Sequence, residues 1–320
     1  MIKKILVTGS NGTIGTRLCE TLLAEGFDVV GADKKTRAWS PVVGEITRTV
    51  DLRDQAMTMA VLPKDVDLII HLAANARVHD LVKDPSRAHD NMTMTFNVLE
   101  HARLNNIPRI MFSSSRETYG NREGAVVNSE DDVRITNCPS PYTASKIADE
   151  AMIHAYQKCY GIDFVNFRFS NVYGMYDDSD RLVPLYLRLT MRNADLLVFG
   201  EEKLLDFTHV DDTVAGVILA IRNFDAVKNH VYNLAFGEGQ RLIDVATAIK
   251  ELTGASSRVV IHENRTGEVV KHIADIAKAR AAFGYAPRIS FAEGLKLAIE
   301  WYRANPQALL EADAHVREAA

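Results

Sequence analysis

Three closely spaced glycines follow a short apolar run near the start of the chain. No other feature of the sequence limits the possible folds as much. The run is Ile5–Thr8, and a G-x-x-G-x-x-G segment follows it directly and opens a helical pattern near Thr13. Glycines let the backbone approach a pyrophosphate closely, and the N-terminus of the next helix stabilises its charge. A glycine turn without function is the alternative. We expect a dinucleotide to be held by Gly9, Asn11, Gly12, Thr13, Ile14 and Gly15.

Apolar runs and helical patterns alternate through the first half of the chain. The runs typical of strands buried on both faces are Ile5–Thr8, Val29–Ala32, Leu68–Leu72, Ile110–Ser113 and Phe164–Phe169. The amphipathic stretches between them are Ile14–Glu25, Arg87–Leu104 and Tyr142–Tyr160. This alternation predicts an α/β fold with a Rossmann-like, doubly wound parallel sheet.

The pattern loosens after Asn171, where a polar loop covers Tyr176–Arg181. We expect residues 1–170, joined by about 208–235, to form the cofactor-binding domain. Residues 171–207 and 236–320 would then form a smaller α/β substrate-binding domain. The last twenty residues carry Pro306 and many Ala and Glu, which predicts a terminal helix or a frayed tail.

Charge and composition exclude several classes of protein. The net charge of the 320-residue chain is −5, and no Lys/Arg-dense stripe is present, so we expect no nucleic-acid partner. No apolar stretch is long enough for a membrane span or a signal peptide. Cys19, Cys138 and Cys159 are too widely spaced for a metal site and indicate reduced thiols. We therefore expect a cytoplasmic protein without a metal ion.

The acid that ends the second predicted strand bears on which cofactor binds. The Asp33 carboxylate can accept hydrogen bonds from both hydroxyls of an adenosine ribose and would repel a 2′-phosphate, which favours NAD over NADP. Lys34, Lys35 and Arg37 follow and could instead attract that phosphate. Further on, Asp51-Leu52 ends a third short run, where the acid could meet the adenine amino group or be a solvated strand-end residue.

Tyr142 and Lys146 are four residues apart on one predicted helix face, with Ser140 as the N-cap and Pro141 as the first helical residue. A phenol has a pKa near ~10, and a nearby cation can stabilise its phenolate. The lysine ammonium could lie beside the tyrosine hydroxyl or beside a bound ribose. A chance pairing on a solvated helix is the alternative. Ser115, at the end of a predicted strand, would lie at the mouth of the sheet, where ligands bind.

The ordered motifs resemble the extended short-chain dehydrogenase/reductase superfamily, in its branch of NAD-dependent nucleotide-sugar epimerases and dehydratases, which includes UDP-glucose 4-epimerase-like proteins. Beyond the glycine segment, the resemblance extends over nearly the whole chain. The matching segments are His71-Leu72-Ala73-Ala74, Asn91, Ser113-Ser114-Ser115 with Tyr119-Gly120, Tyr142 with Lys146, Asn171-Val172-Tyr173-Gly174, Asp206 to Asp212, and Arg265-Thr266-Gly267-Glu268.

The resemblance implies a role for each matched residue. Tyr142 would be the acid/base, Lys146 would hold the nicotinamide ribose, and Ser115 would bond the sugar O4. Asn171 and Arg265 would contact the diphosphate of a nucleoside-diphosphate sugar. The resemblance also implies a homodimer, formed through a bundle of helices that includes the helix carrying Tyr142. Further NAD contacts would come from Lys34, Asp51, Leu52, Leu72, Ala73, Ala74, Asn91, Ser113 and Phe169.

Two positions depart from the family pattern. Leu205 stands where an arginine usually precedes Asp206, so one expected phosphate contact is lost. This could mean a different nucleotide, a shifted pose of the substrate, or compensation by Lys203. We also expect Arg168 to offer a cation near Asn171. In the second departure, Ser115 is followed by Arg116 and Glu117. Glu117 stands where dehydratases and decarboxylases of the branch keep a glutamate, and Arg116 replaces the dehydratase acid. Glu117 could act as a base beside a C4 ketone, or could simply pair with Arg116 or a substrate hydroxyl.

Three functions follow from these motifs. The leading one is an NAD-dependent 4-epimerase that acts on a nucleoside-diphosphate sugar, most commonly a UDP-hexose, with tightly held NAD. The second keeps the C4 oxidation and adds elimination or decarboxylation through Glu117. The third is a non-catalytic NAD-sensing module, because fold alone does not fix function. Arg265 as a surface ion-pair residue is the alternative to its role in substrate binding.

Overall fold

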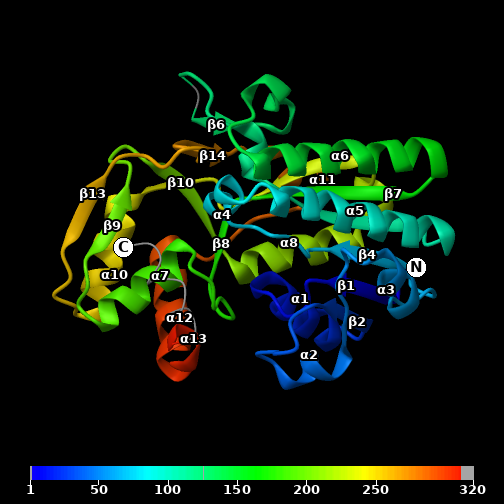
Figure 1. Cartoon of the computed structure of the whole chain (residues 1–320), viewed down its shortest axis with the longest axis horizontal. Helices are drawn as coiled ribbons and strands as arrows, with labels where there is room; N and C mark the ends of the chain where they lie inside the picture. The colour runs from blue at the N-terminus through cyan, green and yellow to red at the C-terminus, as the bar shows by residue number, and fades with distance from the viewer. Residues whose placement is uncertain (1, 125, 311–320) are drawn as a thin grey trace.

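A seven-stranded parallel sheet forms the centre of the larger layer, and all five predicted strands belong to it. The computed structural model describes residues 2–124 and 126–310. The strand order is β11-β7-β5-β4-β1-β2-β3. Figure 1 shows β1, β2, β4 and β7 of this sheet in the half of the molecule that holds the N-terminus. These strands are β1 (Lys4–Thr8), β2 (Asp28–Asp33), β3 (Thr47–Thr49), β4 (Leu68–His71), β5 (Arg109–Ser115), β7 (Asp163–Phe169) and β11 (His230–Leu234). The order reverses between β1 and β4, and ligands bind at such a point of a doubly wound sheet. The Rossmann-like fold is therefore confirmed.

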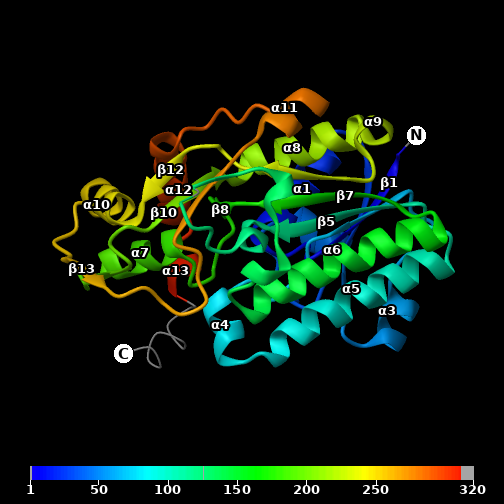
Figure 2. The same ribbon diagram turned by 90° about the horizontal axis from the view of Figure 1, so that it is seen from above.

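Helices cover both faces of this sheet, which explains why its central strands β1, β4 and β5 are mostly buried and carry apolar runs. Ile5 and Val7 pack in one core with Leu18, whereas Leu6 packs on the opposite face with Val98. Figure 2 shows the two helical layers on either side of the strands. One layer holds α1 (Thr13–Ala24), α2 (Pro41–Ile46), α8 (Val210–Arg222), α9 (Phe224–Val227) and α11 (Ala277–Phe283), and the other holds α3 (Gln55–Val61), α4 (Val78–Lys83), α5 (Ser86–Leu104) and α6 (Pro141–Tyr160).

A second layer is built around a mixed sheet in the order β12-β10-β14-β6, with β8 paired to β10. A separate parallel pair joins β9 to β13. A third apolar core lies among its helices and includes Tyr186, Leu205, Val245 and Leu295. The elements of this layer are β6 (Val127–Asn128), β8 (Asn171–Tyr173), α7 (Leu182–Met191), β9 (Leu196–Phe199), β10 (Leu204–His209), β12 (Gly239–Arg241), α10 (Leu242–Thr253), β13 (Val259–His262), β14 (Lys271–Ala274), α12 (Phe291–Ala304) and α13 (Gln307–Leu310).

The chain passes more than once between the two layers, and one buried acid joins them. After β10, α8 and β11 return to the seven-stranded sheet. Asp206 on β10 accepts hydrogen bonds from the amides of Phe236, Gly237 and Ala274 at 3.1, 2.9 and 3.3 Å. This carboxylate therefore fixes β10 to the segment that leaves β11, and so positions the second layer over the ends of the parallel strands.

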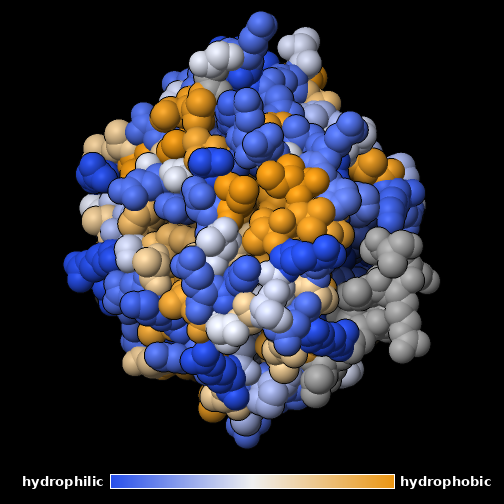
Figure 3. All heavy atoms as spheres, turned by 90° about the vertical axis from the view of Figure 1, so that its left-hand side faces the viewer, coloured by the Kyte–Doolittle hydropathy of each residue, from blue (hydrophilic) through white to orange (hydrophobic). Residues whose placement is uncertain are grey.

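The far end of the second layer carries some apolar surface. Figure 3 shows an apolar patch at the end of the molecule where β9, β13 and α10 lie. These elements expose Leu197, Ile261 and Leu252. No helix among residues 2–124 and 126–310 is long and apolar enough to cross a membrane. Of the predicted terminal helix or tail, residues 301–310 contain the end of α12 and α13, and residues 311–320 lie outside the described part.

Candidate active site

A cavity of about 500 Å³ runs between the carboxyl ends of the parallel strands and the second layer. Nearly all the site residues predicted from the sequence line it. Asn11 and Asn91 do not, and each instead supports a lining segment. The lining residues that were predicted are Gly9, Gly12, Thr13, Ile14, Gly15, Asp33, Lys34, Asp51, Leu52, Leu72, Ala73, Ala74, Ser113, Ser115, Arg116, Glu117, Tyr142, Lys146, Phe169, Asn171 and Arg265.

The glycine turn has no room for side chains at two of its positions. Gly9 has a φ of +75°, and a Cβ there would lie 2.8 Å from the Ala73 amide nitrogen. A Cβ on Gly15 would lie 2.0 Å from the Gly9 carbonyl oxygen. Gly12 precedes α1 without a side-chain cap, and the first turn of α1 holds no acid. The cradle therefore fits a pyrophosphate, because its helix-terminal N–H groups are not occupied by a side chain.

Asp33 ends β2 on the cavity wall and is oriented by its neighbours. Its carboxylate accepts hydrogen bonds from the amides of Asn11 and Lys35 at 2.9 and 2.8 Å, while the Asn11 side chain donates to the Lys35 carbonyl. Asn11 therefore positions Asp33 from behind the wall. The position of Asp33 suits the predicted role at the adenosine ribose.

Asp51, the acid at the end of the third predicted run, is paired with an arginine of the same loop. Asp51 binds Arg53 through both carboxylate oxygens, with the shortest contact at 2.6 Å. These hydrogen bonds lower the pKa of Asp51 to about 2. Asp51 lines the cavity as an ion-paired carboxylate, and its contact with adenine stays a prediction.

Asn91 shapes the loop that follows β4. Its side-chain oxygen accepts from the Asn75 amide at 2.7 Å, and its nitrogen donates to the Asn75 carbonyl at 3.0 Å. The same nitrogen lies 3.4 Å from the Ser145 hydroxyl on α6. Asn91 therefore ties the Leu72–Ala76 segment to the helix that carries the tyrosine, without reaching the cavity.

The tyrosine helix begins as the sequence predicts. The Ser140 hydroxyl accepts a hydrogen bond from the Thr143 amide, and Pro141 is the first helical residue. Lys146 donates from Nζ to the Ser113 carbonyl at 2.9 Å, and its ammonium lies 4.5 Å from the centre of the Phe112 ring. Lys146 is thus anchored to the end of β5, where a ribose can reach it.

The expected stabilisation of the Tyr142 phenolate is not found. Burial raises the pKa of Tyr142 to about 12, and the charge on Glu117 raises it further. The hydrogen bond with Ser115 and the charges on Arg181 and Arg116 oppose this shift without cancelling it. Because desolvation outweighs these groups, Tyr142 is protonated at neutral pH in this structure.

Ser115, Arg116 and Glu117 turn the chain at the end of β5. The Ser115 hydroxyl accepts from the Glu117 amide at 3.1 Å and caps a short 3₁₀ turn, Arg116–Tyr119. Arg116 contacts Glu117 at 2.8 Å and Asn171 Oδ1 at 3.2 Å, and both Arg116 and Glu117 are nearly inaccessible to solvent. Burial raises the pKa of the Glu117 carboxyl. Among the residues that the structure describes, Arg116 Nη1 and Glu117 Oε2 have no hydrogen-bond partner.

The second layer supplies the opposite wall. The Arg265 guanidinium lies 3.8 Å from the centre of the Phe199 ring and makes no ion pair within the described ranges, so it is not the surface ion-pair residue that was the alternative. Leu205 is buried beside Phe207, and Lys203 forms an ion pair with Glu268. Lys203 therefore faces the cavity as a cation that already has a carboxylate partner.

The prediction that Arg168 offers a cation to the substrate is wrong. Its Nε and Nη2 donate to both oxygens of Glu150 at 2.9 and 2.8 Å, and its Nη1 reaches the Glu130 carbonyl at 2.7 Å. Side chains alternate along a strand, so Arg168 points toward α6 while its neighbour Phe169 lines the cavity. Arg168 is a structural residue.

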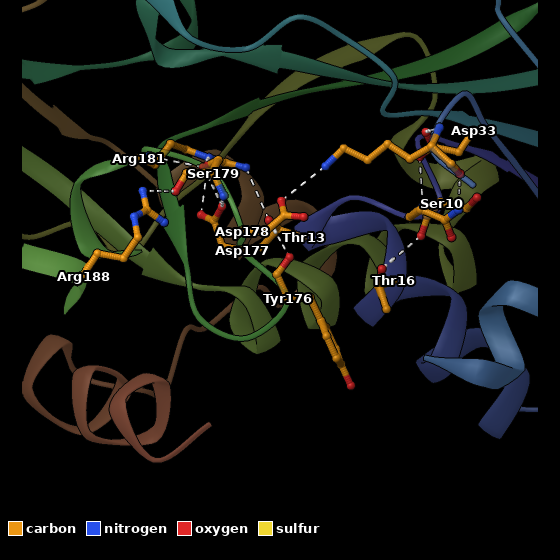
Figure 4. A network of polar contacts seen from close by, with 12 residues as sticks. Ser10, Thr13, Thr16, Asp33, Tyr176, Asp177, Asp178, Ser179, Arg181 and Arg188 are labelled. Atoms are coloured by element: carbon orange, nitrogen blue, oxygen red, sulfur yellow. Dashed lines mark hydrogen bonds and ion pairs between the residues drawn. The ribbon is translucent and has the colours of Figure 1, made fainter. Parts of the chain in front are cut away.

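A strap formed by residues 174–181 crosses the glycine turn, and this placement was not predicted from the sequence (Figure 4). The Thr13 hydroxyl donates to the Tyr176 carbonyl, and Arg181 Nη2 donates to the Thr13 hydroxyl, each at 3.4 Å. Lys35 pairs with Asp178 at 3.2 Å. The acids and serine of this loop showed that it was polar, but no local signal placed it over the cofactor turn.

An aromatic cluster holds the strap from the outside. The Tyr176 and Trp39 rings each meet Trp301 edge to face, at centroid distances of 5.4 and 5.6 Å. The Tyr302 hydroxyl donates to the Asp177 carbonyl at 2.7 Å. The cluster therefore joins the segment after β2, the strap and α12 at the cofactor end of the cavity.

Comparisons with known proteins agree with this site. A model of the "NAD dependent epimerase/dehydratase family" matches residues 5–235. A putative UDP-glucose 4-epimerase from Methanocaldococcus jannaschii is 30% identical, with 94% of this chain and 99% of that protein covered. The crystal structure of UDP-glucose 4-epimerase from Thermotoga maritima with UDP-glucose has a TM-score of 0.85 and 27% identity, covering 95% and 99% of the two chains. MoeE5, solved with UDP-glucuronic acid and NAD, has a TM-score of 0.83 and 29% identity, covering 94% and 99%. With the glycine cradle, Asp33 and the Tyr142–Lys146 pair around one cavity, this chain belongs to the NAD-dependent epimerase/dehydratase family and uses NAD as its cofactor.

Proposed function

We propose that this protein is a 4-epimerase of nucleoside-diphosphate sugars, most commonly a UDP-hexose, and that it works through a transient 4-keto sugar. The observation that carries the proposal is that Tyr142, Lys146 and Ser115 line one cavity beside the glycine cradle, with the Lys146 ammonium fixed on the Ser113 carbonyl. The names and bound sugars of the relatives support a nucleotide-sugar substrate. NAD, when bound, accepts a hydride from the sugar C4 and returns it.

Side chains of the protein would remove and return the proton of the sugar 4-hydroxyl. Ser115 would bond the sugar O4, and Tyr142 would take the proton of the 4-hydroxyl as the carbonyl forms, then give it back. Because the pKa of Tyr142 is about 12 in this structure, proton removal needs further positive charge near the phenol. Lys146, fixed on the Ser113 carbonyl, is placed to hold the nicotinamide ribose. Its ammonium is already present where the pKa of Tyr142 is about 12, so the further charge would come from the oxidised nicotinamide when NAD is bound.

The substrate's nucleotide would lie against the second layer. Apolar and aromatic side chains line this part of the cavity and suit a nucleobase, while Arg265 and Asn171 would contact the diphosphate. With leucine at position 205 and Lys203 paired to Glu268, Arg265 is the main cation on this wall that has no acidic partner among the described residues. The apolar lining consists of Leu182, Val183, Tyr186, Leu197, Phe199 and Leu242.

A dehydratase or decarboxylase is the second candidate, because Glu117 is buried two residues after Ser115. Burial raises the pKa of its carboxyl, which suits a base that acts beside a C4 ketone. The two functions give products of different mass. We therefore propose to incubate the purified protein with UDP-, GDP-, dTDP- and CDP-sugars and to identify the products by mass spectrometry and NMR. An unchanged mass with inverted C4 supports the epimerase, and loss of water or carbon dioxide replaces it with the second candidate.

Tyr142→Phe tests whether the protein is an enzyme or a non-catalytic NAD-sensing module. We expect this change to lower kcat by about 10²–10⁴-fold, because it removes the acid/base, while the variant still binds NAD. Sugar-dependent formation of bound NADH, followed by its near-ultraviolet absorbance, gives a second measurement. If sugars reduce bound NAD equally well in Tyr142→Phe, Tyr142 is not the base.

We also propose a homodimer formed through α5 and α6, which lie side by side (Figure 2). These helices expose Phe96, Leu104 and Tyr160, which are large apolar groups for a free surface. Sedimentation velocity of the wild-type protein and of Phe96→Asp measures this. A wild-type monomer at micromolar concentration would contradict it.

A further inference from the structure

We propose that two buried ion pairs, Arg116–Glu117 and Lys203–Glu268, make the sugar end of the cavity selective for an uncharged sugar and against one that bears a carboxylate. The inference rests on the proposed nucleotide-sugar substrate and names the class of its sugar. It does not depend on which reaction follows C4 oxidation.

The two pairs lie where the reacting sugar would be held. Arg116 and Glu117 directly follow Ser115, and the charge on Glu117 acts on Tyr142. Lys203 and Glu268 come from the second layer, and both charges act on Glu117. All four side chains line the same cavity. A sugar whose O4 reaches Tyr142 and Ser115 would therefore lie against this group of charges.

Each cation of this group already has a carboxylate partner. Arg116 lies 2.8 Å from Glu117, and Lys203 contacts Glu268 directly. Arg116, Glu117 and Lys203 are at least nine-tenths buried, and the side chain of Glu268 is 19% exposed. A sugar carboxylate lying against this group would be its third negative charge, beside only two positive ones. Burying an unmatched charge is unfavourable, so the site discriminates against it.

The free hydrogen-bonding atoms lead to the same conclusion. Within the described part of the chain, Arg116 Nη1 is a buried donor without an acceptor, and Glu117 Oε2 is a buried acceptor without a donor. A sugar hydroxyl can accept from the first and donate to the second. A carboxylate can only accept, so it would leave Glu117 without a donor and would repel its charge. The pair is therefore complementary to hydroxyl groups.

Two probes on the NAD-loaded enzyme test the proposal: UDP-glucose and UDP-glucuronic acid. We expect UDP-glucose to be favoured by about 100-fold in Kd, measured by calorimetry, and in kcat/KM where turnover occurs. We expect Glu117→Gln to move the ratio toward UDP-glucuronic acid by about tenfold, because Arg116 then has no anionic partner. The ratio cancels any general loss of activity in the variant.

Glu201→Gln is the matched control, because it removes the same charge from an exposed position close to Lys203 in the chain. Its ratio should equal that of the wild type. If Glu117→Gln does not fold, Glu268→Gln provides the same test by freeing Lys203. A wild-type protein that binds UDP-glucuronic acid as tightly as UDP-glucose, or an unchanged ratio in both variants, overturns the proposal.

The two possible failures can be told apart. If neither sugar reduces bound NAD, the proposed reaction fails, but the ratio of the two dissociation constants still tests the selectivity. If both sugars are turned over with equal efficiency, the proposed function stands and the selectivity fails.

Discussion

Among the residues that the structure describes, two buried arginine–glutamate pairs differ in how completely their hydrogen bonds are made. In the first pair, Arg168 uses three nitrogens, two of them on Glu150, and Glu150 also accepts from the Ser114 hydroxyl. In the second pair, Arg116 and Glu117 share one short contact, and each keeps one buried atom without a partner among the described residues.

This difference separates a structural pair, Arg168–Glu150, from the pair that we propose binds the sugar, Arg116–Glu117. Most buried polar atoms in folded proteins have a partner, so an exception needs an explanation. The Arg168–Glu150 pair joins β7 to α6 and leaves nothing for a ligand. The Arg116–Glu117 pair has the same chemistry but lines the cavity, and its unused donor and acceptor are available to a substrate. An ion pair therefore indicates a site when its hydrogen bonds are incomplete, and not simply because it is buried.

Breaking the complete pair should have the largest effect. We expect Glu150→Ala to lower the free energy of unfolding by about 3–5 kcal/mol, because Arg168 would remain buried without a counter-charge. Urea unfolding followed by circular dichroism measures it. Glu117→Ala is the matched change in the other pair and should cost clearly less, since one of its oxygens has no partner to lose. Equal losses in the two variants would contradict the distinction.

The tyrosines beside each pair give a second contrast. The Tyr119 hydroxyl donates to Asn233 at 2.6 Å and accepts from Arg168 at 3.3 Å, so Tyr119→Phe should cost about 1–3 kcal/mol of stability. Tyr142→Phe, beside the incomplete pair, should cost less stability and far more activity. Unfolding curves and kcat for both variants decide this. If Tyr119→Phe and Tyr142→Phe lose stability and activity in the same proportion, the two tyrosines do not differ in role.

The pH dependence of stability should also reflect the incomplete pair. Burial raises the pKa of Glu117, so the folded protein binds this proton more strongly than the unfolded chain does. The contribution of Glu117 to stability is therefore greatest below its ordinary pKa and decreases as pH rises toward the raised value. Glu117→Gln removes this dependence, so we expect the variant to gain stability relative to the wild type as pH rises above the ordinary glutamate pKa of about 4.3. A difference that stays constant with pH would show that Glu117 does not titrate in this way.

An exposed ion pair should have the smallest effect on the free energy of unfolding. Lys35 and Asp178 meet at 3.2 Å with side chains that are 51% and 25% exposed. Lys35→Met should change the free energy of unfolding by less than about 1 kcal/mol, because solvent screens such pairs. The same unfolding titration checks it, and a loss as large as that of Glu150→Ala would mean that the strap is far more important for stability than its exposure indicates.

The sequence predicted what depends on local pattern. Apolar runs identified five strands of the main sheet, and Ser140 with Pro141 identified the start of α6, because a cap and its helix are neighbours in the chain. The role of Arg168 was mistaken because its partner Glu150 lies on another element. The strap was missed for the same reason, since the contact between Thr13 and Tyr176 spans 163 residues. Pairing of Arg116 with Glu117 was considered from the sequence because the two are adjacent, but their unpartnered atoms appear only in three dimensions.

The aromatic cluster gives this protein a built-in optical probe. The chain has two tryptophans, Trp39 and Trp301, and their rings touch at the junction of the strap, α12 and the segment after β2. Tryptophan emission therefore comes from this junction alone. A shift in emission when NAD or a sugar nucleotide is added reports movement at the cofactor end of the cavity, so the strap can be followed in real time without a label.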